Sequence, residues 1–458
     1  MSDQTITAKA LGLVPALPAY FKTYRLLRKS QWWSSRQLEE YQVRRLGKLL
    51  DHAYRNVPYY RRVFDERGLK PTDIQNLSDL RKLPFLTKEM IRDNLKDLVA
   101  RNYPQGKLEY VTTGGTSGVP LGFYYEKAVS RATEWAFIKT LWERVGYRFK
   151  DKCILLKGNV VANTDRGKFW ETTFFGRWLI LSSYHMTESN LPEYIKKIRE
   201  FRPKFIQAFP SAITILAKFM EKNSVAPFLS IKAILCGSEN MYPGQRELIE
   251  GILHCPVYTW YGHAERVVLA GECNQRTGYH IFPEYGITEL VRDDGTPVAG
   301  ENETGTIVGT GLTNYALPLI RYKTDDQAAW ASGDCSCGRK YPRLKTVKGR
   351  WLQEFIITGN NRPISITAIN MHSDVFDNVA QFQFYQDRKE EVIFNVVKKP
   401  GYTDRDTEYI KKELARKLGG DIDLVIRFVD NIPRTERGKY RFLIQKLPLG
   451  MGEENSGQ

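Results

Sequence analysis

Long apolar runs, cysteines and a secretory leader are scarce or missing in this 458-residue sequence. No stretch of about 20 apolar residues is present, which excludes a membrane-spanning helix. The N-terminal stretch MSDQTITAKALGLVPALPAYF lacks the cleavage pattern of a secretory signal. Six cysteines in a chain of this length do not form a disulfide framework. We therefore expect a cytoplasmic globular protein with two or three domains of about 100–200 residues each.

Acidic residues are the scarcer charge, because 52 Asp and Glu stand against 68 Lys and Arg. Residues 20–62 hold eleven basic residues and three acidic ones. A helix predicted there carries Lys22, Arg25 and Lys29 on one face. Its apolar residues are Tyr20, Phe21, Tyr24 and Leu27. This pattern fits either a helix that lies on an anionic inner-membrane surface or an ordinary solvated surface. No recognition module accompanies the charge, so nucleic acid binding is not expected.

The order of periodic segments predicts an α/β fold. Residues 1–100 are mostly helical in pattern, with SSRQLEEYQVRRLGKLLDHAY as the clearest helix and Ser34 or Ser35 as its cap. From 108 to 340, short apolar runs alternate with amphipathic segments, which indicates a largely parallel sheet with helical crossovers. Residues 281–331 change to strand–turn–strand signals with DDG and ETG turns. A small α+β unit follows the GRW at 349–351.

The loop in YVTTGGTSGVPLGFYY, residues 110–125, lacks the lysine of a P-loop. A P-loop ends in Gly-Lys-Ser/Thr, whereas Gly118 is followed here by Val119 and Pro120. Glycines still allow the backbone N–H groups to turn inward, and hydroxyls add further donors. Taken alone, the loop fits either a phosphate-binding loop or an ordinary polar turn.

Six motifs in one order resemble the adenylate-forming enzymes, the acyl-CoA synthetase superfamily. They are TTGGTSGVP at 112–120, GSE at 237–239, YGHAE at 261–265, PLIRYKTDD at 318–326, KGR at 348–350 and PRTERGKYRF at 433–442. The N-terminal segments LDHAYRNVPYYRRVF and DLRKLPFLTKEMIRDN are similar to the phenylacetate–CoA ligase branch and its capsule-biosynthesis, CapK-like relatives. The resemblance implies that a carboxylate attacks the α-phosphate of ATP, giving an acyl-adenylate and pyrophosphate. A nucleophile then displaces AMP.

The resemblance also implies a domain division. An N-terminal adenylation domain is expected over residues 1–349, including the helical N-terminal region and a β region at 270–340. A small, mobile α+β lid domain is expected over residues 350–447. The tail, 448–458, is expected to be disordered.

Site residues follow from the same motifs. Glu265 matches the glutamate that holds magnesium, and Lys439 matches the lysine that reaches the carboxylate and α-phosphate during adenylation. An exposed basic turn is the other interpretation of RTERGKYR. The predicted ATP and AMP site consists of Thr113, Gly114, Gly115, Thr116, Ser117, Gly118, Ser238, Glu239, Tyr261, Gly262, Asp326 and Arg350.

Four positions depart from the pattern of the superfamily. Val119 stands where many relatives have lysine, and Ala264 replaces a common threonine. Asp325 stands where glycine is usual, and Leu352 lies where an aspartate often follows Arg350. These departures leave open a third class of protein, a catalytically inactive nucleotide-binding homologue.

A second constellation contains Cys273, His280, Cys335 and Cys337. Three thiols and one imidazole are a standard tetrahedral zinc set, and Cys-x-Cys-Gly resembles a metal knuckle. Similar positions in the phenylacetate–CoA ligase branch imply a structural zinc that staples the β region. The alternative is free thiols beside a surface histidine. Cys153 and Cys236 are expected in the apolar core.

The acid and the acceptor are less constrained. Aromatic walls favour an aromatic or apolar acid, although the same residues would serve equally well in a core. Coenzyme A is the default acceptor of the acyl group, and an amine or hydroxyl of a sugar precursor in surface polysaccharide biosynthesis is the alternative. The predicted pocket residues are Phe209, Pro210, Tyr258, Trp260 and His263.

Overall fold

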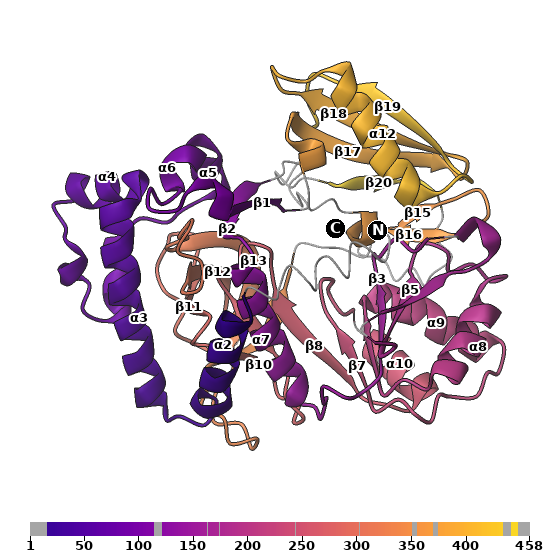
Figure 1. Ribbon diagram of the computed structural model, residues 1–458, viewed down its shortest axis with the longest axis horizontal. Helices are drawn as coiled ribbons and strands as arrows, with labels where there is room; N and C mark the ends of the chain where they lie inside the picture. Colours follow the sequence, from indigo (N-terminus) through magenta and orange to yellow (C-terminus); the bar gives the residue numbers. More distant parts are fainter. Residues whose placement is uncertain are drawn as a thin grey trace.

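The computed structural model has a large α/β part and a smaller C-terminal unit, which confirms the predicted fold class (Figure 1). No helix of the described part of the chain has both the length and the apolar character to cross a membrane. The described residues are 16–113, 121–162, 164–173, 175–242, 244–301, 303–349, 355–369, 374–433 and 441–447.

Helices dominate the first hundred residues, as predicted. The helix α3 begins with a capping box, in which the Ser34 hydroxyl accepts a hydrogen bond from the Gln37 backbone and the Gln37 side chain accepts one from the Ser34 backbone. Ser34 is therefore the cap, rather than Ser35. The α-helices are α2 Leu17–Ser30, α3 Ser35–Asn56, α4 Pro58–Glu66, α5 Lys88–Asp93 and α6 Leu95–Leu98. The 3-10 turns are η2 Pro71–Asp73, η3 Leu77–Lys82 and η4 Gln105–Lys107.

The predicted basic helix is α2, which packs against α7, Val129–Glu143. The Tyr24 hydroxyl donates to Glu143 at 2.9 Å, and the Lys139 ammonium lies 3.7 Å from the Tyr24 ring centroid. The apolar face is narrower than predicted, because Phe21 remains 47% exposed. The cations of this helix are exposed as well. Its association with a membrane surface stays a prediction.

A 12-stranded sheet runs through the large part in the order β11-β12-β13-β14-β10-β9-β8-β7-β6-β3-β5-β4. The strands β5, β3, β6, β7 and β8 pair in parallel, as the alternating pattern predicted. Their bounds are β3 Cys153–Lys157, β5 Trp178–Ser182, β6 Phe205–Ala208, β7 Ala233–Cys236 and β8 Val257–Gly262, with β4 Trp170–Thr173 at the edge. The remaining helices of this half are α8 Leu191–Phe201, α9 Pro210–Lys222, α10 Gln245–Leu253 and the turn η5 Thr164–Arg166.

The other half of the sheet is antiparallel. The DDG sequence makes the predicted turn, in which the Arg292 N–H donates to the Thr296 carbonyl at 2.8 Å and Gly295 adopts a φ of +83°. The ETG sequence is not a turn, because the strand β12 already starts at Thr304. The bounds are β9 Leu269–Gly271, β10 Tyr279–Ile281, β11 Gly286–Val291, β12 Thr304–Gly311, β13 Tyr322–Trp330 and β14 Arg343–Lys348. A separate hairpin consists of β1 Leu108–Thr112 and β2 Gly122–Glu126.

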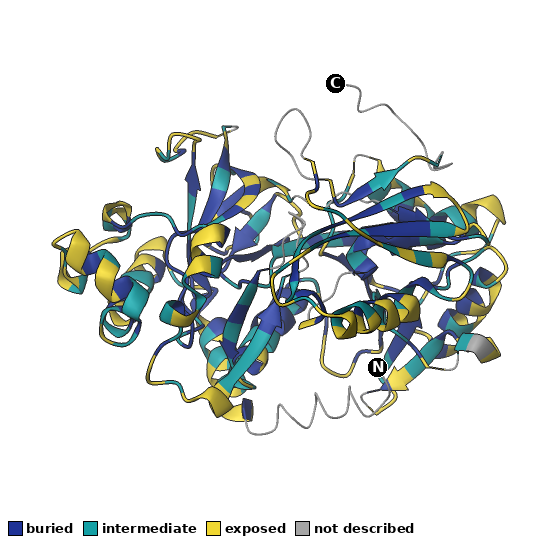
Figure 2. Ribbon diagram, turned by 90° about the horizontal axis from the view of Figure 1, so that it is seen from above, coloured by how far each residue is buried: buried dark blue, intermediate teal, exposed yellow. Residues whose placement is uncertain are grey.

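The C-terminal unit is a four-stranded sheet with the order β19-β18-β17-β20, crossed by one long helix. Figure 2 shows its strands buried and the outer face of that helix exposed. Its core joins that of the large part, because Phe382 and Phe394 belong to the same apolar cluster as Ile154 and Leu156. The bounds are β15 Phe355–Ile357, β16 Pro363–Ser365, α11 Ile366–Ile369, η6 Asp374–Phe376, β17 Val379–Arg388, β18 Glu391–Lys398, α12 Asp404–Leu418, β19 Asp423–Phe428 and β20 Leu443–Gln445.

Candidate active site

The hairpin β1–β2 closes the base of the predicted triphosphate loop. The Thr113 N–H donates to the Leu121 carbonyl at 2.9 Å, and the Leu121 N–H donates to Thr113 Oγ1 at 3.2 Å. On β2, the Tyr125 hydroxyl donates to the Ala264 carbonyl, so the hairpin contacts the segment that carries Glu265. The predicted loop residues Gly114, Gly115, Thr116, Ser117 and Gly118 lie outside the described residues, and their role stays a prediction.

Glu265 is buried just beyond β8 and has two polar neighbours. Its carboxylate accepts a hydrogen bond from the Tyr322 hydroxyl at 2.6 Å and lies 3.3 Å from His263 Nδ1. Burial raises the pKa of this carboxyl, but His263, the charge of Lys88 and the Tyr322 hydroxyl together outweigh burial and hold the pKa below its ordinary value. Glu265 therefore presents a carboxylate near neutral pH, which is the form that a hard cation requires.

Lys88 lies beside the candidate site, although no sequence motif predicted it there. Its side chain is 7% exposed, and its Nζ lies 3.0 Å from the Asp325 carboxylate. Hydrogen bonds between Leu86 and the backbone of Arg321 and Lys323 hold the start of α5 beside β13. The sequence showed only a lysine at the start of a capped helix. The nearness of Lys88 to Glu265 arises from this long-range pairing.

Asp326 lies on β13 opposite Tyr261 of β8. The Tyr261 hydroxyl donates to the Asp326 carboxylate at 2.8 Å. Burial first, and then the charge of Asp326, raise the pKa of Tyr261, so this hydroxyl stays a donor. The neighbouring Asp325 adopts a φ of +63°, the left-handed conformation that glycine would take without strain. Asp325 thus keeps a glycine-like backbone at the position where the sequence departs from the pattern.

The segment after β7 places Ser238 and Glu239 differently. Ser238 is exposed and has a φ of +72°. Glu239 accepts hydrogen bonds from the Ser211 backbone and hydroxyl, each at 2.9 Å, and from the Ser365 hydroxyl at 2.7 Å. Burial raises the pKa of the Glu239 carboxyl. This side chain ties the N-terminus of α9 to the C-terminal unit, and the predicted adenine-flanking role of the segment stays a prediction.

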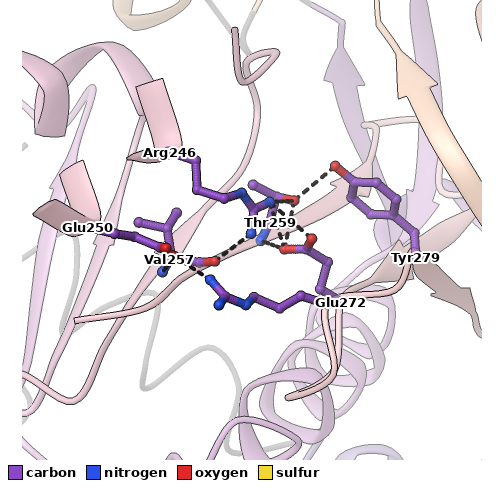
Figure 3. Close-up of polar contacts among 7 residues, drawn as sticks. Arg246, Glu250, Val257, Thr259, Glu272 and Tyr279 are labelled. Carbon is purple, nitrogen blue, oxygen red and sulfur yellow. Dashed lines mark hydrogen bonds and ion pairs between the residues drawn. The ribbon is translucent and has the colours of Figure 1, made fainter. Parts of the chain in front are cut away.

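A hydrogen-bond network fixes β8, the strand that carries Trp260, Tyr261 and Gly262 (Figure 3). Glu272 accepts hydrogen bonds from the Thr259 N–H at 2.6 Å and from Arg246 of α10 at 3.0 Å. The strand therefore has a defined register next to β9. A side chain at Gly262 would be crowded, because a Cβ on it would lie 3.0 Å from Leu269 Cδ1 and 3.1 Å from Trp260 Cζ3.

The predicted acid-pocket residues lie in three different surroundings. Phe209 caps α9, Pro210 begins it, and the Phe209 and Trp260 rings both lie near the ammonium of Lys157. His263 contacts Glu265 instead. The remaining residue, Tyr258, packs with Trp260 against the cluster of α7 and β9. No motif in the sequence singled out Lys157.

The predicted hinge residue Arg350 and the predicted catalytic residue Lys439 lie outside the described residues, so their roles stay predictions. The segment before the hinge is fixed by Asn240, whose side chain donates to the Gly349 carbonyl at 2.8 Å and accepts from the Gly349 N–H at 3.0 Å.

The four predicted zinc ligands come together in one cluster. The sulfurs of Cys273 and Cys335 are 3.7 Å apart, and the Cys337 sulfur lies 3.6 Å from His280 Nε2. All four ligand atoms lie within 4.8 Å of one another. Tetrahedral ligands at about 2.3 Å from zinc would lie nearly 4 Å apart, so this donor set fits zinc. Cys153 and Cys236 are buried in apolar surroundings, as predicted.

Comparison with known proteins supports the class of enzyme that the sequence motifs predicted, the adenylate-forming ligases. The CapK C-terminal domain family matches residues 356–446. The phenylacetate–coenzyme A ligase of Escherichia coli is 33% identical over 333 residues, which cover 71% of this chain and 74% of the relative. The phenylacetate–coenzyme A ligase of Thermus thermophilus is 27% identical over 448 residues, 88% of this chain and 96% of the relative. Protein CapK of Staphylococcus aureus is 24% identical over 438 residues, which cover 93% of this chain and 92% of the relative.

Among solved structures, 2-hydroxyisobutyryl-CoA ligase in complex with 2-HIB-AMP and CoA has a TM-score of 0.60 at 19% identity, covering 90% of each chain. This likeness shows the shared fold. Together, the fold and the relatives define an AMP-forming ligase of the adenylate-forming superfamily. Within that superfamily, the chain belongs to the phenylacetate–coenzyme A ligase family.

Proposed function

We propose that the chain activates a carboxylic acid with ATP, releases pyrophosphate and transfers the acyl group from the adenylate to coenzyme A. The observation that carries this proposal is the grouping of Glu265, Asp326 and the base of the 113–121 loop. Tyr125 links the hairpin to the Glu265 segment, and Tyr261 links β8 to Asp326. Acid, metal-bound triphosphate and ribose would then occupy neighbouring places.

Each charged group has a distinct role in this proposal. Glu265 would hold Mg²⁺, which when bound neutralises charge on the triphosphate. Asp326 is acceptor-only and suits the ribose hydroxyls. Lys88 supplies a buried cation whose charge acts on Glu265, and it would compensate for the lysine that many relatives have at the position of Val119. Lys439 would stabilise the charge that develops between the carboxylate and the α-phosphate.

The Cys273, His280, Cys335 and Cys337 cluster would hold a structural zinc. All four positions are occupied by protein ligands, so such a site is closed and has no open position for catalysis. It would join the β9–β10 connection to the segment before β14, and would stabilise this end of the sheet.

A different acceptor has one specific observation in its favour. The C-terminal unit matches the CapK C-terminal domain family over residues 356–446. In the proposed reaction this part of the chain supplies Lys439 to the first half and would meet the acceptor in the second. The alternative is therefore acyl transfer to an amine or hydroxyl of a sugar precursor in surface polysaccharide biosynthesis.

Mass spectrometry of the products separates the two acceptors. The enzyme is incubated with ATP, Mg²⁺ and an acid that supports activation, with and without coenzyme A. We expect an acyl-CoA thioester and AMP to accumulate over many turnovers only when coenzyme A is present. Stalling at one enzyme-bound acyl-adenylate despite coenzyme A, with release upon addition of an amino sugar or nucleotide sugar, would contradict this choice and favour the alternative.

A further inference from the structure

Lys157 ends β3 at the carboxyl edge of the parallel strands, where ligands of α/β sheets bind. Its Nζ lies 6.0 Å from the ring centroid of Phe209 and 5.5 Å from that of Trp260. Both rings belong to the predicted acid pocket. The backbone at this point is fixed, because the Ser183 hydroxyl donates to the Lys157 carbonyl at 3.0 Å.

The next residue fixes the lysine further. A Cβ on Gly158 would lie 3.0 Å from the Ala368 backbone of α11 and 3.1 Å from the Tyr184 hydroxyl. That hydroxyl donates to the carbonyls of Gly158, at 2.9 Å, and of Ala368, at 2.7 Å. Lys157 therefore stands at a rigid junction between the parallel sheet and the C-terminal unit.

Within the described ranges, the surroundings of the Lys157 ammonium contain no carboxylate contact. Among the described residues, none forms an ion pair or hydrogen bond with the Lys157 ammonium, and the groups that act on its charge are the thiols of Cys236 and Cys153. Burial lowers the pKa of Lys157 to about 8, which leaves the group mostly protonated at neutral pH. A half-buried cation with only aromatic rings and thiols beside it among the described residues is incompletely compensated, and a bound anion would supply the missing charge.

A second donor lies in the same group of side chains. The indole Nε1 of Trp260 is buried and has no hydrogen-bond partner in the described part of the chain. A Cβ on Gly237 would lie 2.5 Å from this nitrogen, so only glycine lets the backbone pass here. The aromatic walls thus carry two donors that lack acceptors, the Lys157 ammonium and the Trp260 N–H.

We propose that Lys157 is a specificity residue which selects carboxylic acids bearing a second anionic group, held beside Phe209 and Trp260 while the first carboxylate is adenylated. This inference rests on the proposed function, because it assumes that these rings line the acid site. It changes the predicted substrate from an apolar or aromatic acid to a dianionic acid.

Matched pairs of acids test this selection. Butyrate is compared with glutarate, and phenylacetate with 4-carboxyphenylacetate, in acid-dependent exchange of labelled pyrophosphate into ATP. In the wild type, we expect kcat/KM for the diacid of a pair to exceed that for the monoacid by at least about tenfold, the size of one hydrogen bond to a charged group. Lys157→Met should remove this preference by raising KM for the diacid, and Lys157→Arg should restore most of it.

Lys152→Met is the matched control. Lys152 lies just before the first residue of β3, at the other end of the strand from Lys157, and its ammonium donates to the Phe201 carbonyl. It should leave the preference unchanged. Equal kcat/KM values of the wild type for both acids of each pair would overturn the inference. An equal fall in kcat/KM for both acids in Lys157→Met would overturn it as well.

Direct binding separates a failure of this inference from a failure of the proposed function. Calorimetric titration of the same diacids measures affinity without catalysis. If no acid supports exchange but Lys157→Met weakens diacid binding at least about tenfold, the proposed function fails, while an anion-binding role of Lys157 is retained. If the diacids bind equally to wild type and Lys157→Met, the inference fails whatever the exchange shows.

Discussion

Replacing Glu265 by glutamine should lower acid-dependent pyrophosphate exchange at least about 100-fold, because losing a metal ligand removes several kcal/mol of transition-state stabilisation and each 1.36 kcal/mol is tenfold in rate. Glutamine keeps the size of the side chain and an oxygen that accepts from Tyr322. It loses the charge that would hold Mg²⁺ beside Lys88. The Mg²⁺ concentration needed for half-maximal exchange should therefore rise. The unfolding temperature should change little.

The matched control for Glu265→Gln is Asp151→Asn. Asp151 is also a buried, paired carboxylate, with Lys204 as its partner at 2.8 Å. It lies before the start of β3, at the opposite edge of the parallel strands from the site. Exchange should stay within about threefold of wild type. A Glu265→Gln enzyme whose exchange rate equalled that of Asp151→Asn would remove Glu265 from the proposed metal site.

The second large effect concerns the cysteine cluster. Cys335→Ser should lower the unfolding temperature by on the order of 10 °C, because it breaks a metal link between segments about 60 residues apart in sequence. Differential scanning fluorimetry measures the shift, and elemental analysis of the same samples measures zinc. A chelator strong enough to remove zinc should shift wild type similarly and leave Cys335→Ser unchanged.

Cys255→Ser is the control for that substitution. Cys255 is buried in the apolar cluster of the parallel half and is not among the four clustered ligands. The unfolding temperature of the Cys255→Ser protein should fall by only a few degrees, since placing one hydroxyl in an apolar site costs about 1–3 kcal/mol. This variant should keep its zinc. Purified wild-type protein with less than about 0.5 equivalent of zinc would count against the site.

Local patterns in the sequence were sufficient for most elements. The α3 cap at Ser34 and the buried strand β6 follow from short-range rules, and the structure confirms them. The order of the strands does not follow from such rules. β3 lies between β5 and β6, so its neighbours are decided by crossover packing rather than by sequence order.

The candidate site likewise contains residues that sequence motifs could predict and residues that they could not. Glu265 and Asp326 could be proposed because motifs fix them relative to their own strands. Lys88 and Lys157 could not, since their surroundings come from segments far away in sequence, such as Asp325 for Lys88 and Trp260 for Lys157. A lone lysine carries no local signal of burial, and only the assembled sheet reveals what it faces.

Glu239 illustrates a limit of motif matching. The motif predicted that Glu239 lies beside the adenine, but a motif does not show which residues the Glu239 side chain contacts. In the fold the carboxylate is engaged by Ser211 and Ser365, both more than 25 residues away in sequence. Its contribution to the junction between the two units therefore depends on long-range packing.

Exchange of labelled pyrophosphate into ATP, driven by a panel of monocarboxylic and dicarboxylic acids, tests the central claim most directly. It reports the first half-reaction alone and so does not depend on the acceptor. An AMP-forming ligase predicts exchange that requires both acid and Mg²⁺ and is strongest with one group of acids. Tight ATP binding without exchange for any acid would contradict the account and favour a nucleotide-binding homologue that has lost catalysis.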